Sequence, residues 1–508
     1  MANRVSTNAH DAVAKNSTGP EKALWLAGWA QVIPALLVGL ALRIFLVLRF
    51  PSFADDSRIY EDLAGNWLRA HVYGLAGPGG AIVATDIRAP GYPTFLTLVY
   101  LIIGRGQWAI SLAQTFLDLG TCFLVAWLAA RLAVGAAGGT PSGRQSTVGM
   151  AALWLAVTCP LVANYAAIPL TEVLATFLTA AALLAFVSGF LATDCPEIIT
   201  GPSPGAWMFF AGGLLAGLGT LARPETPLLL LALALVLALR WRRPANWSKL
   251  VRAGLLTAMG VLLPLAPWAA RNWIRFHEVQ FLAPRYAASA GEYVPRGLYA
   301  WTATWLVRYR DVYQVPWKIS TDPIALDDLP PSAFDSPAER ARVAALLAQY
   351  NENECLTPEL DRGFAQLARE RTARHPLRTH LWVPLERAAT LWLTPRTELL
   401  PVSGHLTPLR EQWRDDPVDV TVTLLLGALN FLYLGLAIAG ALRIAHTRSR
   451  HATTAAALLV TFILVRTAFL TQVETPEPRY VLECFPALLA LGAMCWLGKP
   501  SSTVLDGS

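Results

Sequence analysis

Long apolar runs constrain this chain more than any other feature of its sequence. A helix needs about 20 apolar residues to cross the hydrocarbon core of a bilayer, and several runs reach that length. The runs lie at 26–50, 90–104, 107–132, 148–167, 169–193, 206–222, 225–240, 253–270, 418–442, 452–471 and 480–498. They predict an α-helical, polytopic membrane protein.

The composition supports this class. Only 15% of the 508 residues are charged, whereas a soluble domain carries roughly 25%. The 18 tryptophans gather near the ends of apolar runs, where amphipathic rings favour the membrane interface. The first apolar run is long and lacks a clear cleavage site, so we predict a retained first span and not a removed signal peptide.

Charge and cysteine content argue against other classes. A net charge of +6 would suit a nucleic-acid partner, but the basic residues occupy short loops between apolar runs, as membrane orientation requires. The six cysteines form no CxxC pair, so neither a zinc site nor a disulfide framework is predicted. The expected partners are therefore membrane lipids and no nucleic acid.

The basic loops predict the orientation of the spans. The loops at 240–252 and 443–451 are rich in arginine, and short basic loops stay in the cytoplasm. With both loops inside an inner (plasma) membrane, the stretch 272–416 faces the periplasm or the exterior.

The run at 90–104 is predicted not to cross. Counting crossings from the basic loops places residues 51 and 107 on the same side of the membrane. The run also opens with Pro90-Gly91-Tyr92-Pro93 and is too short to span upright. We therefore predict an interfacial or re-entrant helix here and about ten spans in total.

The external stretch carries signals of helices. Ser336-Pro337 and Thr357-Pro358 have the pattern of helix starts, and the amphipathic stretch 376–395 is a candidate to lie on the membrane. The predicted parts of the chain are a cytoplasmic N-terminal segment (1–25), a transmembrane module (26–271) with an outer loop (51–106), a small external soluble domain (272–416), C-terminal transmembrane helices (417–498) and a disordered tail (499–508).

Ionisable residues gather near the external ends of the spans. Charge at such depth is expensive and usually functional. These residues, with one asparagine among them, are Asp55, Asp56, Arg88, Glu172, Arg223, Glu225, Arg271, Asn272, Glu474, Glu477 and Arg479.

Five short motifs pass through these positions in order. Each is weak alone, and the series is more specific than its parts. The motifs are D-x-x-x-Y-x-x-x-A at Asp56–Ala64, R-x-P-G-Y-P at Arg88–Pro93, an acidic residue at Glu172, P-W-x-x-R-N at Pro267–Asn272 and E-x-R-Y-V-L at Glu477–Leu482.

In this order the motifs resemble the membrane glycosyltransferases of the GT-C fold, specifically the family 39-like group related to protein mannosyltransferases and the lipid A aminoarabinose transferase. The likeness covers nearly the whole chain. It implies a GT-C-like bundle that transfers a sugar, with inversion, from a polyprenyl-phosphate carrier to a lipid, glycan or protein acceptor on the outer face. The Asp55-Asp56 pair and the Pro-Gly-Tyr-Pro segment depart from the Asp-Glu and Pro-Pro-Leu of the protein-modifying branch, which points to the diverse bacterial branch.

The resemblance also implies roles. Asp56 is the predicted catalytic carboxylate, with Asp55 as the alternative, and Glu172 is a second acidic position that orients the acceptor or helps to hold a divalent ion. Metal dependence stays open, because members of the fold differ in it. Such a transfer needs a base for the acceptor hydroxyl and cations for the leaving phosphate. The phosphate candidates are Arg88, Arg271, Arg479 and Arg223, and the acceptor or pocket candidates are Tyr60, Tyr92, Asn272 and Glu477.

Simpler interpretations exist for these residues. The two aspartates would start a solvated loop, Glu172 would cap a helix N-terminus, and Arg271 and Arg479 would be interfacial anchors. Arg223 with Glu225 is typical of a structural ion pair, and the tyrosines would be packing residues.

Two other functions remain open. The first is a transporter or flippase of a lipid-linked or small polar substrate, although the sequence has neither the inverted repeat expected of one nor charges spread over both faces. The second is an inactive scaffold or assembly subunit.

Overall fold

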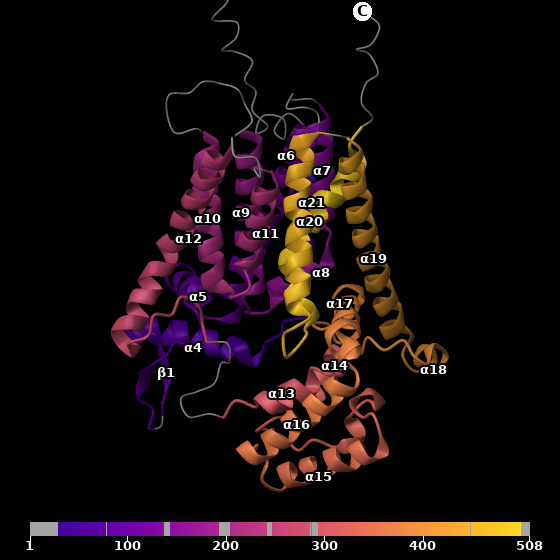
Figure 1. The fold of residues 1–508 in the computed structure, drawn as a ribbon. Helices are drawn as coiled ribbons and strands as arrows, with labels where there is room; N and C mark the ends of the chain where they lie inside the picture. Colours follow the sequence, from indigo (N-terminus) through magenta and orange to yellow (C-terminus); the bar gives the residue numbers. More distant parts are fainter. Residues whose placement is uncertain are drawn as a thin grey trace, which may run out of the picture.

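A computed structural model describes residues 29–77, 79–136, 143–192, 204–240, 246–284, 286, 293–447 and 449–498. The predicted cytoplasmic segment 1–25 and the predicted disordered tail 499–508 lie outside the described residues, as do residues 241–245 of the first basic loop. Within the described ranges the chain is almost entirely helical, with one small sheet. Figure 1 shows a bundle of long helices whose lower end carries a separate helical domain.

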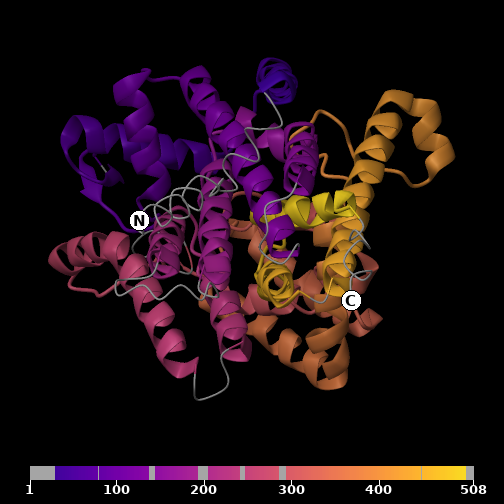
Figure 2. The same cartoon turned by 90° about the horizontal axis from the view of Figure 1, so that it is seen from above.

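Eight described helices or helical segments are long and apolar enough to cross a membrane. α12 and α19 lie at opposite sides of the bundle (Figures 1 and 2). Of the eight, these two helices have the smallest buried share of their apolar stretch, and α3 comes next. The eight are α3 (Trp29–Arg49), α6 (Gln107–Ala136), α9 (Glu172–Ala192), α10 (Pro204–Ala222), α12 (Trp247–Phe276), α19 (Pro417–His446), α20 (Arg450–Leu470) and the segment of η6 (Pro478–Cys484), α21 (Phe485–Ala493) and η7 (Met494–Trp496).

A bent pair and a short helix complete the bundle. α7 (Gly143–Val157) is followed, after a bend of 49°, by α8 (Pro160–Ala163) and η1 (Asn164–Ala167). α11 (Leu228–Arg240) is apolar but only 13 residues long. Counting the bent pair as one span gives up to nine candidate spans in the described ranges, close to the predicted number of about ten.

A buried arginine supports the bend. Pro160 has no N–H with which to continue α7. Arg43 of α3 is fully buried and donates from Nη1 to the carbonyl of Val157, the last residue of α7, at 3.0 Å. The same guanidinium donates from Nε to Asp118 of α6 at 2.7 Å. A charged pair inside the bundle therefore joins three spans at this point.

The outer loop folds against one end of the bundle. It contains α4 (Asp55–Ala70), α5 (Gly91–Ile102) and the two-stranded antiparallel sheet of β1 (Gly74–Ala76) and β2 (Ile82–Ala84). α5 has 12 residues, too few to cross a bilayer, so the prediction that the 90–104 run does not cross is confirmed. A Cβ on Gly91 would lie 2.5 Å from the carbonyl oxygen of Leu221. Glycine thus lets the start of α5 touch the end of α10.

The helical domain beyond the bundle has a core of its own. Trp301, Tyr350 and Phe364 are fully buried in it. Both predicted helix starts are confirmed, because Ser336 accepts from Glu339 N and Thr357 from Leu360 N. Its elements are α13 (Arg296–Thr302), α14 (Tyr309–Gln314), η3 (Leu326–Asp328), η4 (Pro331–Ala333), α15 (Pro337–Asn353) and α16 (Pro358–Arg374).

The stretch after this domain returns to the bundle. It forms η5 (Arg378–Trp382) and α17 (Val383–Leu393), and α18 (Leu409–Asp415) then leads into α19. Trp392 donates to Thr467 Oγ1 of α20 at 2.9 Å, and Asn430 of α19 donates to the carbonyl of Trp392 at 2.6 Å. The end of α17 therefore packs between α19 and α20.

Candidate active site

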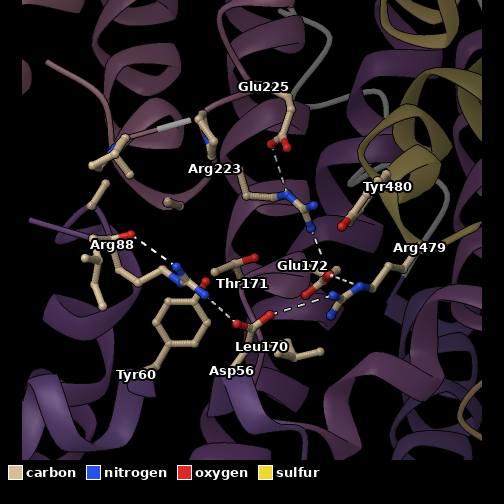
Figure 3. A pocket seen from close by; sticks show the side chains of 16 residues that line it. Asp56, Tyr60, Arg88, Leu170, Thr171, Glu172, Arg223, Glu225, Arg479 and Tyr480 are labelled. Atoms are coloured by element: carbon tan, nitrogen blue, oxygen red, sulfur yellow. Dashed lines mark hydrogen bonds and ion pairs between the residues drawn. The ribbon is translucent and has the colours of Figure 1, made fainter. Parts of the chain in front are cut away.

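A cavity of about 260 Å³ lies at the domain-bearing end of the bundle. Its wall is made by segments that are far apart in sequence and meet where several helices begin or end. Figure 3 shows the charged side chains turned toward one another around it. The lining residues are Asp56, Tyr60, Ile87, Arg88, Ala89, Leu170, Thr171, Glu172, Ala222, Arg223, Pro224, Glu225, Ala283, Pro284, Arg479 and Tyr480.

The positions of these side chains follow from the ends of the helices. Asp56 lies in the first turn of α4, and Glu172 is the first residue of α9. Carboxylates are stabilised there by the positive end of the helix dipole. Arg223 directly follows α10, and Arg479 lies at the start of η6. The fold thus brings two carboxylates and two guanidiniums together where α4, α9 and η6 begin and α10 ends.

The carboxylates and guanidiniums form a continuous network. Arg88 Nη2 lies 2.7 Å from Asp56 Oδ1, and Arg223 Nη1 lies 2.8 Å from Glu172 Oε1. Arg479 lies between the two carboxylates, 3.7 Å from an oxygen of each. Asp56 and Glu172 are therefore linked through one guanidinium, and each also pairs with a second arginine, Arg88 and Arg223 respectively.

The network alters the protonation of the groups on α4. Burial alone would raise the pKa of Asp56, but the charge and the hydrogen bond of Arg88 outweigh it and hold this pKa below its usual value. Burial, with a smaller contribution from the charge of Asp56, raises the pKa of Tyr60 to about 12. At neutral pH Asp56 is therefore an anion, and Tyr60 is a neutral hydroxyl beside it.

Two features leave this network open to a ligand. The side chain of Asp56 is 34% exposed, whereas that of Glu172 is only 3% exposed. Glu172 Oε2 is buried and has no hydrogen-bond partner in the described part of the chain. Because buried polar atoms are nearly always paired, this oxygen is a position where a hydroxyl of a bound molecule would donate.

The structure brings together six of the predicted site residues. They are Asp56, Tyr60, Glu172, Arg88, Arg223 and Arg479. The other five, Asp55, Tyr92, Arg271, Asn272 and Glu477, do not line the cavity. Asp55 is exposed on α4, one position away from the inward-facing Asp56.

Tyr92 supports the wall of the cavity from behind. Its hydroxyl donates to Gln114 Oε1 of α6 at 2.9 Å, and its ring meets that of Tyr60 edge to face at 5.1 Å. Gln114 in turn donates to the carbonyl of Ile168 at 2.8 Å, four residues before Glu172. Through Gln114, the buried Tyr92 therefore supports the turn that precedes α9.

Arg271 and Asn272 fasten the end of α12 to the outer loop. Arg271 donates to the carbonyl of Tyr73 at 3.0 Å and to Asn272 Oδ1 at 2.8 Å, with its guanidinium 5.0 Å from the Trp268 ring. Asn272 donates to the carbonyl of Gln280 at 3.2 Å. The last turn of α12 thus directs both side chains to neighbouring backbone and away from the cavity.

Glu477 lies one layer behind the cavity. Its Oε2 is 2.5 Å from Arg479 Nε, and its Oε1 accepts from the hydroxyl of Tyr480 at 2.6 Å. It therefore holds the two cavity residues that follow it in the chain.

Sequence reasoning did not single out two groups near the site. Glu225, taken for part of a structural pair, lines the cavity 3.5 Å from Arg223. Glu483 and Arg466 form a buried pair, 2.5 Å apart, inside the bundle. The signal for the latter pair was present, because each interrupts an apolar run, where charge is seldom placed without a purpose.

The cavity residues do not fit a bound divalent ion. The three carboxylates that would be its ligands, Asp56, Glu172 and Glu225, already contact guanidiniums, and three arginines at the same wall would repel a dication. In the described ranges no three His, Cys, Asp or Glu side chains are grouped so as to hold a metal ion. We therefore assign no step to a metal.

No protein-family model matches the sequence, and no curated protein matches it. Among solved structures, the chain is similar to the archaeal oligosaccharyltransferase AglB from Archaeoglobus fulgidus, in complex with an inhibitory peptide and a dolichol-phosphate. The identity is 12% and the TM-score is 0.48, over 93% of this chain and 50% of that one. It is also similar to ArnT from Cupriavidus metallidurans in the apo state, at 13% identity and a TM-score of 0.35, over 94% of this chain and 78% of that one.

Another structure of the Archaeoglobus fulgidus oligosaccharyltransferase, tethered to an acceptor peptide, gives 12% identity and a TM-score of 0.49. The chain spans about half the length of these oligosaccharyltransferase chains. We base the function on the cavity itself and on the motifs.

Proposed function

We propose that this protein is a membrane glycosyltransferase that moves a sugar from a polyprenyl-phosphate-linked donor to a hydroxyl of an acceptor on the outer face of the membrane. One observation carries the proposal. Three arginines and three carboxylates from five segments converge on one cavity at the end of a membrane bundle. Arginine binds phosphate through a planar fork of donors, and a lipid-linked donor must present its phosphate at the membrane boundary.

The size of the cavity supports a small head group. Pockets for small molecules have volumes of roughly 300–1,000 Å³, and this one measures about 260 Å³. We propose that it holds one sugar with its phosphate, while the polyprenyl chain stays in the lipid beside the bundle. An oligosaccharide would not fit inside it.

The proposed reaction is a single displacement with inversion. The acceptor oxygen forms a bond to the anomeric carbon while the bond from that carbon to the phosphate oxygen breaks, and the electron pair leaves with the phosphate. Arg88, Arg223 and Arg479 offset the charge that develops on the phosphate. Such electrostatic stabilisation is effective because the donors are already in place before reaction.

Asp56 is the proposed carboxylate that engages the acceptor. Its lowered pKa makes it a weak base, so it orients the hydroxyl first and takes the proton once the new bond has made that proton acidic. Glu172 Oε2, which has no hydrogen-bond partner among the described residues, accepts a hydroxyl of the sugar or of the acceptor. Arg479 contacts both carboxylates and thus joins the donor and acceptor sides.

The location follows from the same proposal. The cavity end of the bundle also carries the helical domain, and the basic loops predict that this end is external. We propose a multi-pass protein of the inner (plasma) membrane with its site facing the periplasm or exterior. Its partners would be membrane lipids, the polyprenyl-phosphate sugar, and a lipid, glycan or protein acceptor.

The test uses the purified full-length protein in proteoliposomes with a labelled polyprenyl-phosphate sugar. Asp56→Asn should abolish transfer of label, whereas the adjacent Asp55→Asn should retain it, because Asp55 is exposed outside the cavity. Undiminished transfer by Asp56→Asn would refute the assignment. Movement of the donor across the membrane without any glycosyl product would instead support the transporter.

A further inference from the structure

A second ionic cluster lies directly behind the cavity wall. Its centre is Glu483 of η6, which is 1% exposed. Arg466 of α20 donates from Nη2 to Glu483 Oε1 at 2.5 Å. The hydroxyls of Thr179 of α9 and Thr226 between α10 and α11 donate to Glu483 Oε2 at 3.1 and 3.3 Å. None of these four side chains lines the cavity.

The cluster lies toward the membrane interior. Thr179 is two turns along α9 from Glu172, which corresponds to about 10 Å. Arg466 is fully buried and has its Nη1 without a hydrogen-bond partner in the described ranges. Charges at such depth are expensive, and here two arginines and two hydroxyls contact the single carboxylate of Glu483.

The cluster reaches the cavity through one residue. Arg223 Nε lies 3.4 Å from Glu483 Oε1, and Arg223 Nη1 lies 2.8 Å from Glu172 Oε1. Its third nitrogen, Nη2, makes no hydrogen bond within the part of the chain that the structure describes. Because the guanidinium is planar, fixing two nitrogens fixes the direction of the third.

We propose that Glu483, itself held by Arg466, is a positioning residue for Arg223, which it fixes so that Nη2 is presented to the leaving phosphate of the donor. This inference rests on the proposed glycosyl transfer. Glu483 does not touch the substrate. It acts on the rate only through the guanidinium in front of it.

The central experiment is a double-mutant cycle on kcat. Glu483→Gln keeps the shape of the side chain and removes its charge. We expect kcat to fall roughly ten- to a hundredfold, as for a small misplacement of a group at a reaction centre, with the acceptor KM unchanged. In an Arg223→Gln background the same change should have no further effect, whereas in an Arg88→Gln background the full loss should persist.

The chain offers a matched control for loss of stability. Asp118 and Arg43 form another buried pair in the bundle, outside the cavity. Asp118→Asn should reduce the amount of folded protein as Glu483→Gln does, yet leave kcat per folded molecule unchanged. Glu483→Asp, which keeps the charge, should recover part of the lost turnover.

A milder variant decides the matter if Glu483→Gln does not accumulate. Thr179→Val removes one hydrogen bond to Glu483 and no charge, and it should lower kcat in the wild-type background but not in Arg223→Gln. Equal losses in both backgrounds, or no loss in either, would overturn the positioning role. Wild-type protein that transfers no sugar would refute the proposed function instead, so the two failures are distinguishable.

Discussion

Two arginine–carboxylate networks in this bundle differ in how completely their polar groups are paired. Around Arg43, the guanidinium contacts Asp118, the carbonyls of Gly39 and Val157, and Cys122 Sγ, and the ion pair is almost fully buried. Around the cavity, Asp56 is partly exposed, and Glu172 Oε2 has no hydrogen-bond partner within the described ranges. In the first network the guanidinium has its hydrogen-bond partners within the protein, whereas in the second a carboxylate oxygen is left for a ligand.

This difference distinguishes charged residues that stabilise the fold from charged residues that bind a substrate. A buried ion pair is tolerated when its remaining donors and acceptors are satisfied, and the Arg43 pair meets that condition while it joins three spans. A site that binds a phosphate must keep donors and acceptors available. The degree of pairing is therefore a better guide to function than charge or depth alone.

The largest expected effect after that of Asp56→Asn comes from removing the arginine that contacts both Asp56 and Glu172. Arg479→Gln should lower kcat about 10²- to 10³-fold, the usual loss when one fixed donor to a developing charge is removed. Steady-state transfer with a labelled donor would measure it. A loss that appears only in the acceptor KM would contradict its assignment to the donor phosphate.

Breaking the closed network should affect stability and not chemistry. Asp118→Asn leaves Arg43 buried without its counter-ion, which costs about 3–5 kcal/mol. A thermal unfolding scan in detergent should show a lower midpoint, and kcat per folded molecule should match the wild type. If Asp118→Asn had normal stability and a reduced kcat, the Arg43 network would serve the reaction and would not differ in role from the cavity network.

The open network should also control a pH dependence. Arg88 lowers the pKa of Asp56, and the ionised carboxylate is the active form, so activity is lost as the pH falls through that pKa. In the wild type this acid limb lies below the usual carboxyl range of about 4. Arg88→Gln removes the lowering charge, so the acid limb of the kcat/KM profile should move to higher pH. An unchanged limb would show that Asp56 is not the titrating group.

The smallest expected effect concerns divalent metals. Because guanidiniums already contact all three carboxylates of the cavity, dialysis against EDTA should leave the transfer rate unchanged. Restoration of a lost activity by Mg²⁺ or Mn²⁺ would show that a metal ion displaces an arginine during turnover.

Some parts of the site were predictable and others were not. The spacing of four from Asp56 to Tyr60 correctly placed both side chains on one helix face, and parity of crossings correctly placed Asp56 and Glu172 together. The same motifs did not reveal that Tyr92 and Glu477 stand behind the wall, because a motif records which residue is present and not which neighbour it meets. Arg271 was predicted at the phosphate for its place at a span end, but the last turn of α12 points it to Tyr73.

The sequence by itself determined the membrane class, the approximate number of spans and the gathering of ionisable residues near one set of helix ends. These properties depend on hydrophobic length and on the placement of charge, which are local and additive along the chain. Only the tertiary structure decided which charges share a cavity, because contacts such as that of Arg479 with both Asp56 and Glu172 depend on how separate helix ends pack. It also decided that Arg466 and Glu483 stand behind Arg223, since pairing across spans leaves no pattern in either segment alone.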